Sequence, residues 1–438
     1  MKEGLKRIIR QFLLRIQPYA RTDMVYLARG GFWSTANFFA SSLFSGLLII
    51  AFGNFLPKET YGNYKFIMSL AGTLGFLMFI GINTAVIRAA AQGKIGVLAY
   101  SIRLQLRWNF IFTAAMGMVS IYYLVQNNTL FAVALGLLAL GVPLISTFNT
   151  YGAFLSGRKE FKRLAMYSSL TTLFYSMSMC GAIILSTNII VIVFAYILGS
   201  LLPLLYFHRQ VTRDLPLLPL TPGEKNEIVS YAKHLNIMNI LGNLSQYVDK
   251  IVVFHYLGAI QLAVYGFALA IPERIRGYLK SITGLALPKL SERSIADITR
   301  NFYRRIFQGI LVGALISASY IILAPPVFKL VLPKYLDAVH YSQVIALSFI
   351  LLLPGTYIGD IFRSQKMIRA LYLSSLGGHL TKIILFVVLG TLWGIWGVII
   401  ASQTVIVLGF FYNIIIWEIE KKRIVPTYSE VPAENLEF

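Results

Sequence analysis

Apolar stretches long enough to cross a membrane recur along the chain, and this feature constrains the fold more than any other. Because a helix needs about 20 apolar residues to cross the hydrocarbon core of a bilayer, each stretch predicts one membrane-spanning helix. The sequence therefore predicts an all-α polytopic membrane protein with about twelve transmembrane helices. The predicted spans lie near residues 30–52, 64–87, 104–124, 129–151, 164–185, 189–207, 234–256, 261–288, 306–328, 341–362, 370–390 and 394–417.

The composition supports a lipid environment. Hydrophobic residues make up 57% of the chain and charged residues 13%, with a mean hydropathy of +0.69. A soluble domain carries about a quarter charged residues, and a globule of this size could not hide so much apolar surface. The single cysteine, Cys180, excludes an internal disulfide and a site made of several thiolates.

Basic residues gather in every second connection between the predicted spans. Because Lys and Arg are retained on the cytoplasmic side, these connections and both termini are expected in the cytoplasm. The opposite connections hold only Lys58, Lys329 and Lys334. The net charge of +21 is therefore mainly a signal of topology and does not favour nucleic-acid binding. The basic segments are residues 1–29, 88–107, 152–163, 208–233, 289–305, 363–369 and 418–438.

The domain organisation follows from a weak internal repeat. At one constant shift, Tyr64 falls on Tyr265 and Phe66 on Phe267, and both halves contain six spans. This predicts two parallel six-helix lobes with a substrate cavity where they face each other. The predicted parts are a basic amphipathic segment (1–29, with a helix over 2–17), an N-lobe (30–207), a linker (208–233), a C-lobe (234–417) and a tail (418–438). A capping box at Thr221 and Glu224 predicts a helix that opens in the linker.

Charged residues near the middle of the seventh and eighth spans break the symmetry of the repeat. Each ionised side chain at this depth costs about 2.5–3.5 kcal/mol unless it meets water, a partner or a ligand. One interpretation is a salt-bridge cluster that joins the two spans. The other is a cationic cavity that receives an anion, and the excess of positive charge favours it. The charged residues are Asp249, Lys250, Glu273, Arg274, Arg276 and Lys280.

The sequence carries no sign of an enzyme. It has no Gly-rich phosphate loop, no His/Cys/Asp pattern with metal-ligand spacing and no large outer loop that could hold an active site. No catalytic residue, metal or cofactor is therefore expected.

Two segments resemble Wzx-like oligosaccharide flippases of the multidrug/oligosaccharidyl-lipid/polysaccharide exporter superfamily. Residues 52–91 resemble the family's first helical hairpin, and residues 230–271 resemble its seventh and eighth spans. Pro57 stands where the family tends to have the first glycine of the turn. The positions that carry the resemblance are Leu56, Gly62, Tyr64, Gly81, Arg88, Asp249, Lys250, Leu257, Gly258 and Tyr265.

The resemblance implies a MATE-like architecture and a function. Such proteins move polyprenyl-diphosphate-linked oligosaccharides from the inner to the outer leaflet of the cell membrane, for assembly of surface polysaccharide. The glycolipid and polysaccharide polymerase or assembly proteins would then be partners. Arg274, Arg276 and Lys280 would neutralise the diphosphate. Arg88 and Lys250 would help at the cavity wall, and Asp249 or Glu273 would couple transport to an H⁺ or Na⁺ gradient.

Other functions remain open at this point. A drug or organic-cation antiporter of the same superfamily predicts an anionic cavity. A flippase or scramblase for another anionic lipid shares the argument from charge. A membrane scaffold of the polysaccharide assembly machinery would leave Arg274, Arg276 and Lys280 replaceable without loss of function.

Overall fold

In a computed structural model of the chain, residues 24–213, 215–216, 218–284, 290 and 293–424 are described. These residues form helices joined by short turns, with no strand among them. The predicted amphipathic helix over residues 2–17 and the part of the tail from residue 425 lie outside the described residues.

Long apolar helices confirm the predicted all-α polytopic membrane protein. In the described part of the chain, nine helices are long and apolar enough to cross a membrane, and the bent pair Lys58–Leu77 and Ile82–Ala91 supplies a tenth span. Two of the nine, α11 (Pro222–Gly284) and α16 (Ile368–Ile424), each contain one residue with non-helical backbone angles, Gly258 and Gly394. Each of these two glycines divides its long helix into two shorter helices.

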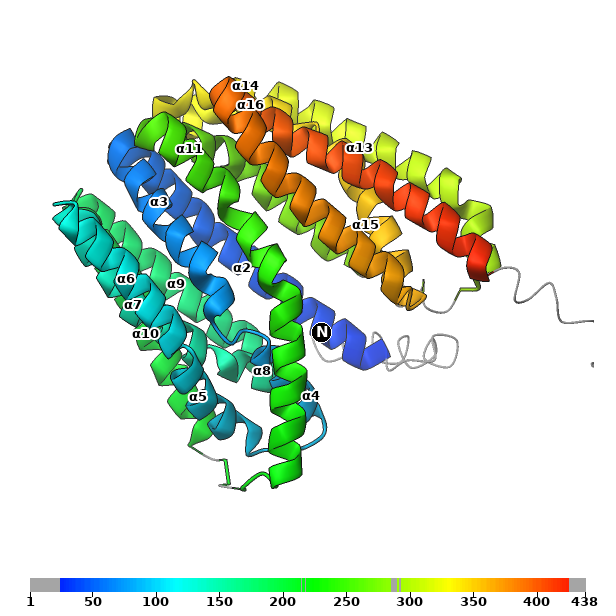
Figure 1. The fold of residues 1–438 in the computed structure, drawn as a ribbon, viewed down its shortest axis with the longest axis horizontal. Helices are drawn as coiled ribbons and strands as arrows, with labels where there is room; N and C mark the ends of the chain where they lie inside the picture. Colours follow the sequence, from blue (N-terminus) through cyan, green and yellow to red (C-terminus); the bar gives the residue numbers. More distant parts are fainter. Residues whose placement is uncertain (1–23, 214, 217, 285–289, 291–292, 425–438) are drawn as a thin grey trace, which may run out of the picture. The chain divides into compact units, whose positions relative to one another are not determined.

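Contacts divide the chain into two compact units, and unit 1 consists of Met1–Phe52 and Leu74–Asn239. Within it α6 packs beside α7, α7 beside α10, and α10 beside α9 (Figure 1). Its aromatic core includes Tyr167 stacked on Phe207 at 4.3 Å between ring centroids. Besides residues 222–239 of α11, its elements are most of α2 (Met24–Phe55), η1 (Gly75–Leu77), α4 (Ile82–Ala91), α5 (Val97–Trp108), α6 (Phe110–Val125), α7 (Thr129–Phe148), α8 (Thr150–Gly157), α9 (Phe161–Leu185) and α10 (Ile189–Thr212).

Unit 2 consists of Gly53–Thr73 and Ile240–Phe438. Within it α13 packs against α15, and α15 packs against α16 (Figure 1). Phe302 and Trp417 stack in its core with ring centroids 4.9 Å apart. Its elements are most of α3 (Lys58–Leu74), α11 from Ile240 onward, α13 (Ile295–Val331), η2 (Pro333–Tyr335), α14 (Ala338–Ala346), α15 (Phe349–Ser364) and α16. The lobes predicted over 30–207 and 234–417 stay a prediction.

Polar side chains cap the N-termini of several helices. The backbone N–H of Thr221 donates to Glu224 Oε2 at 2.9 Å, and the N–H of Glu224 donates to Thr221 Oγ1 at 3.3 Å. This reciprocal pair confirms the predicted capping box at the start of α11. The side chains of Asn128 and Ser294 cap α7 and α13 in the same manner, each accepting from a backbone N–H three residues on.

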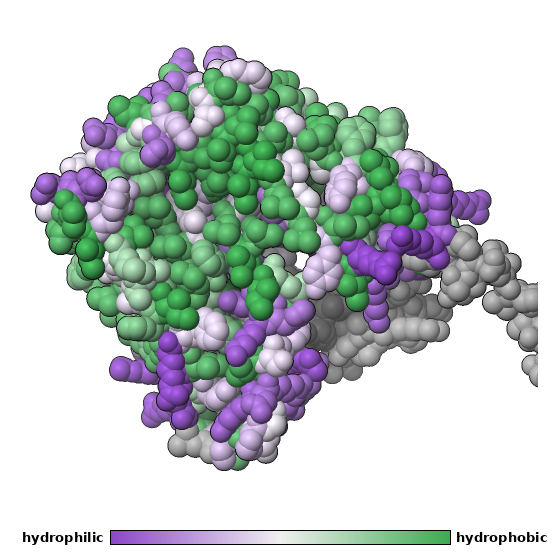
Figure 2. All heavy atoms as spheres, viewed as in Figure 1, coloured by the Kyte–Doolittle hydropathy of each residue, from purple (hydrophilic) through white to green (hydrophobic). Residues whose placement is uncertain are grey.

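The outer faces of the helices are apolar. Figure 2 shows hydrophobic residues across much of the visible face, and the most exposed large side chains include Leu185 (86%) and Leu330 (85%). Exposed apolar area is unfavourable in water by about 25 cal/mol per Å², so a surface of this kind requires a lipid solvent. The protein is a multi-pass membrane protein.

Gly258 permits the sharp turn that divides α11. Its backbone angles (φ 83°, ψ 179°) lie in a region that only glycine populates readily. We expect Gly258→Ala to lower the free energy of unfolding by about 1–3 kcal/mol, which is the cost of holding a side-chain-bearing residue there. The measurement is the thermal unfolding midpoint of the purified protein in detergent.

Gly378→Ala is the matched control for this turn. Gly378 lies inside α16, and a Cβ added there meets nothing within 4 Å. Because alanine favours a helix over glycine, this variant should be as stable as the wild type or slightly more stable. Equal midpoints for Gly258→Ala and Gly378→Ala would contradict the account of the turn.

Candidate anion-binding site

The predicted cationic residues of the eighth span lie on the second part of α11, residues 259–284. Gly258 is the only residue with non-helical backbone angles inside α11, so the helix continues through Pro272 without a break. Glu273, Arg276 and Lys280 therefore keep the helical spacing that places them on one face, and Arg274 lies about 100° around the axis.

Arg276 is held by neutral groups at the junction of α14 and α15. Its Nε and Nη2 atoms donate to Ser348 Oγ at 3.1 and 2.5 Å, and Nη2 also donates to the carbonyl of Ile345 at 3.5 Å. Ser348 donates its own proton to the same carbonyl, at 2.7 Å. The guanidinium is thus oriented by hydrogen bonds, and none of the described carboxylates contacts it directly.

Among the described residues, the charged residues predicted for the seventh and eighth spans form one ion pair. Lys250 Nζ lies 3.7 Å from Asp249 Oδ2. Within the described part of the chain, the side chains of Glu273, Arg274 and Lys280 form no salt bridge, and all three are exposed at the protein surface. The arrangement is therefore not the self-neutralising salt-bridge cluster that the sequence left open.

Asp249 is the buried carboxylate of the set, with 6% of its surface exposed. The hydroxyl of Tyr265 donates to its Oδ2 at 2.9 Å. Its Oδ1 is buried and accepts no hydrogen bond from the described residues. A carboxylate inside a membrane span with one oxygen left without a donor is suited to bind a proton or a cation.

Two further cations belong to this group and were not assigned to a site from the sequence. Lys65 on α3 lies near the charges of Lys250, Glu273 and Arg274. Lys382 on α16 lies near Asp249, Lys250, Glu273 and Arg276. We call this set, with Lys280, the charged cluster of unit 2. Its six cations exceed its two carboxylates by four, whereas the sequence predicted an excess of two.

The remaining predicted site residue, Arg88, lies on α4 in unit 1. Its Nη2 is 3.3 Å from Glu227 Oε1, and its guanidinium lies 5.3 Å from the ring centroid of Tyr231. Both partners are on the first part of α11. Arg88 therefore has a local partner for its charge, and its contact with a substrate stays a prediction.

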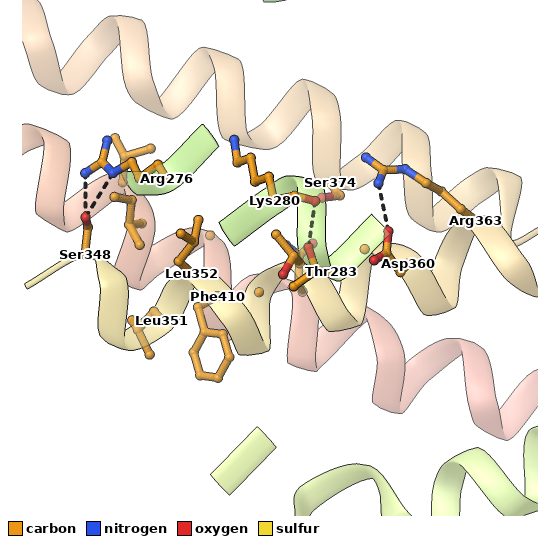
Figure 3. Close-up of a pocket in the computed structure, with 17 residues that line it drawn as sticks. Arg276, Lys280, Thr283, Ser348, Leu351, Leu352, Asp360, Arg363, Ser374 and Phe410 are labelled. Atoms are coloured by element: carbon orange, nitrogen blue, oxygen red, sulfur yellow. Dashed lines mark hydrogen bonds and ion pairs between the residues drawn. The ribbon is translucent and has the colours of Figure 1, made fainter. Parts of the chain in front are cut away.

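A pocket of about 590 Å³ lies in unit 2 between α11, α15 and α16. Arg276 and Lys280 line it from α11, one helical turn apart, while the other predicted site residues do not. Figure 3 shows Arg276, Lys280 and Arg363 in sequence along the pocket. At its far end Arg363 donates to Asp360 Oδ1 at 3.0 Å. The charged lining residues are Arg276, Lys280, Arg363 and Asp360, so the pocket carries a net charge of +2.

The fold is shared with solved transporters. An inward-facing multidrug resistance MATE family transporter of the MOP superfamily is 16% identical, with a TM-score of 0.69 over 87% of this chain and 96% of that chain. The lipid II flippase MurJ, in an inward closed conformation, is 17% identical, with a TM-score of 0.64 over 89% of this chain and 88% of that one.

A third similar structure is a MOP superfamily transporter from Pyrococcus furiosus, for which a reverse polarity of the binding pocket suggests a different function. It is 17% identical, with a TM-score of 0.57 over 88% of this chain and 95% of that chain. Among curated proteins, none matches the chain.

The long apolar helices and the fold shared with these structures define a multi-pass membrane protein with a MATE-like fold. The sequence profile of a family described as polysaccharide biosynthesis protein matches residues 27–294, more than half of the 438 residues. The chain belongs to this family, and the resemblance to Wzx-like flippases is confirmed.

The hydrogen bond from Tyr265 to Asp249 gives a test of the site's geometry. We expect Tyr265→Phe to lower the free energy of unfolding by about 1–3 kcal/mol, because it leaves a buried carboxylate without its hydroxyl donor. Tyr335→Phe is the matched control, since the Tyr335 hydroxyl is buried in the same unit without a partner among the described residues. Thermal unfolding of both variants in detergent checks this. A loss in Tyr335→Phe as large as that in Tyr265→Phe would contradict it.

Proposed function

We propose that the protein flips polyprenyl-diphosphate-linked oligosaccharides from the inner to the outer leaflet of the cytoplasmic membrane, for assembly of cell-surface polysaccharide. The observation that carries this proposal is a pocket whose excess of positive charge is not neutralised by any carboxylate among the described residues. Arg276 donates hydrogen bonds to Ser348, which is neutral, and its side chain also lines the pocket. Its positive charge can therefore attract an anionic ligand in the pocket.

The chemistry of this substrate class matches the pocket. A diphosphate needs cationic contacts, and Arg offers it two parallel donors while Lys offers a point charge. Membership of a polysaccharide biosynthesis family favours a glycan as cargo. An excess of positive charge is unfavourable for an organic cation, so the charge weighs against a drug antiporter.

The orientation and the partners belong to the same proposal. Lys and Arg gather in both terminal segments and in every second connection, which favours a cytoplasmic position for both termini. The glycolipid would enter from the inner leaflet and be released to polymerase or other assembly proteins outside. Transport would proceed by alternating access, without a catalytic step on the substrate.

The direct test removes the two pocket cations of α11. We expect Arg276→Ala/Lys280→Ala to slow transport tenfold or more, because each charge-assisted hydrogen bond to phosphate contributes about 1.5–3 kcal/mol. The measurement is the rate at which a lipid-linked oligosaccharide crosses the membrane of proteoliposomes, followed by access of an added lectin to the sugar.

Arg300→Ala/Arg304→Ala is the matched control for this test. These two arginines are exposed on α13, have the same spacing of four residues and do not line the pocket. If both double variants transport at the wild-type rate, the assignment of Arg276 and Lys280 is wrong. Mass spectrometry of lipids that co-purify with the wild type identifies the glycan, whereas co-purified organic cations would favour an antiporter.

Asp249 is the candidate for coupling to an H⁺ or Na⁺ gradient, because it is buried and its Oδ1 accepts no hydrogen bond from the described residues. We expect Asp249→Asn to transport at a rate that no longer responds when the gradient is collapsed, because an amide cannot bind the ion. Glu273→Gln is the matched control, since Glu273 is exposed while Asp249 is buried. The measurement is transport into proteoliposomes with and without ionophore. If the transport rate of the wild type does not change when either gradient is collapsed, Asp249 has no coupling role.

A further inference from the structure

A pocket of about 420 Å³ lies at one end of unit 1, where the beginning of α5, the end of α10 and the beginning of α11 meet (Figure 1). Its lining includes two cations, Arg103 on α5 and Lys225 on α11, and no carboxylate from the described residues. Most of the other residues that line it are apolar. The proposed function makes no use of this pocket.

The two cations of the pocket have no carboxylate partner. Glu224 and Glu227, which flank Lys225 on α11, both pair with Lys94, at 3.6 and 3.4 Å. In the described part of the chain, no ion pair includes Lys225 or Arg103. The pocket lining therefore carries a net charge of +2 that an anion can neutralise.

The pocket lies at the depth of lipid head groups. Helices α5 and α6 together form a span of 29 residues, Val97–Val125, whereas about 20 residues cross the hydrocarbon core. The only charged residues of this span, Arg103 and Arg107, lie near its first end. Hydrophilic residues also gather at this end of the visible face (Figure 2). The hydrocarbon therefore surrounds the later part of the span, and Arg103 lies at the level of the head groups.

The linker that borders the pocket, between α10 and α11, is apolar. Residues 215–220 read LPLLPL, and Leu218 is 54% exposed. An exposed leucine is unfavourable in water. Pro216 and Pro219 have no backbone N–H, so they leave no donor that would need a partner away from water. Such a segment is suited to the boundary between the head groups and the acyl chains.

Close packing fixes the linker against α5. A Cβ built on Gly96 would lie 2.0 Å from the carbonyl oxygen of Leu218, so only glycine admits the linker at this point. Leu220 is buried in the core of unit 1, in the same cluster as Val97 and Leu98 of α5. The walls of the pocket are therefore in place before a ligand arrives.

A ligand that fits this pocket has both an anionic group and an apolar part. A free inorganic anion would use the cations and leave the apolar lining uncovered. A zwitterionic phospholipid would bring a further cation next to Arg103 and Lys225. An anionic phospholipid supplies a phosphodiester charge and acyl chains at the depth of the pocket, and basic pockets between membrane helices bind such head groups. The volume of about 420 Å³ is sufficient for a head group and the first part of a chain.

We propose that this pocket binds an anionic phospholipid of the surrounding leaflet, with the phosphate on Arg103 and Lys225 and an acyl chain against the apolar linker. Arg103 offers paired donors to the phosphate and Lys225 a point charge. Residues 222–239 of α11 belong to unit 1, so the bound lipid would connect two helices of the same unit and stabilise it. The site does not depend on the cargo, so it can fail or hold independently of the proposed function.

The test is native mass spectrometry of the purified full-length protein in detergent, titrated with phosphatidylglycerol or with phosphatidylcholine of the same chain length. The wild type should bind the first phosphatidylglycerol at least fivefold more tightly than the first phosphatidylcholine. Arg103→Gln/Lys225→Gln should bind both lipids equally, because glutamine remains polar but carries no charge. An unchanged preference in this variant would overturn the proposal.

Arg209→Gln/Arg213→Gln is the matched control for the pocket variant. These two arginines are exposed at the end of α10 and do not line the pocket. Because this variant loses the same charge at the same end of unit 1, it should keep the preference for phosphatidylglycerol. If it loses the preference as the pocket variant does, the lipid is attracted by the general positive charge of this end and the pocket assignment is wrong.

Glycerophosphoglycerol separates a lipid site from a site for soluble anions. It is the head group of phosphatidylglycerol without acyl chains, so it should compete at least tenfold less well than the intact lipid. Equal competition would overturn the lipid assignment. Leu218→Ser should weaken phosphatidylglycerol binding at least threefold, whereas Leu140→Ser, which changes an exposed leucine of α7 outside the pocket, should not. Equal binding by both serine variants would contradict the role of the linker.

Thermal unfolding in detergent gives a second measurement. Without added lipid, both glutamine double variants should unfold at the midpoint of the wild type, because neither pocket cation forms an ion pair in the described part of the chain. Added phosphatidylglycerol should raise the midpoint of the wild type and of Arg209→Gln/Arg213→Gln, and leave that of Arg103→Gln/Lys225→Gln unchanged. An equal rise in all three proteins would also overturn the proposal.

Discussion

Positive charge inside apolar helices is the constraint on which the rest of this structure depends. Each ionised group at mid-membrane costs about 2.5–3.5 kcal/mol, and the charged cluster of unit 2 holds six cations against two carboxylates. Only Lys250 has a carboxylate within salt-bridge distance in this set. The other charges must be met by hydrogen bonds, water or a ligand, so the fold has to provide a polar space beside α11.

The way in which Arg276 is held shows how this space is prepared for an anion. Ser348 and the Ile345 carbonyl fix the guanidinium but contribute no negative charge. An incoming anion would therefore gain the attraction of Arg276 without having to break an ion pair. A carboxylate in place of Ser348 would stabilise the empty protein and remove this advantage, because the desolvated pair would have to be separated before the ligand could bind.

The sequence predicted the helices and their breaks well, because both follow from local rules. Long apolar runs require spans, and Leu257-Gly258 marked the turn where α11 divides. The spacing of Arg276 and Lys280 likewise predicted that they share a face, and both line the pocket. What the sequence could not supply was the partner helices. Lys65 and Lys382 join the charged cluster from helices distant in the sequence, and Asp360 and Arg363 line the pocket from α15.

The reason for this limit is physical. A helix that is apolar all around has no amphipathic stripe to set its rotation, so its pattern does not say which residues face the interior of the unit. The rotation is fixed by close packing instead, such as that of Gly313 against Phe349, which depends on pairs of surfaces. The same distinction separates the two kinds of glycine in unit 2. In the sequence Gly313 and Gly359 are equivalent, and only their surroundings show that α15 packs closely against the first while the second borders the pocket.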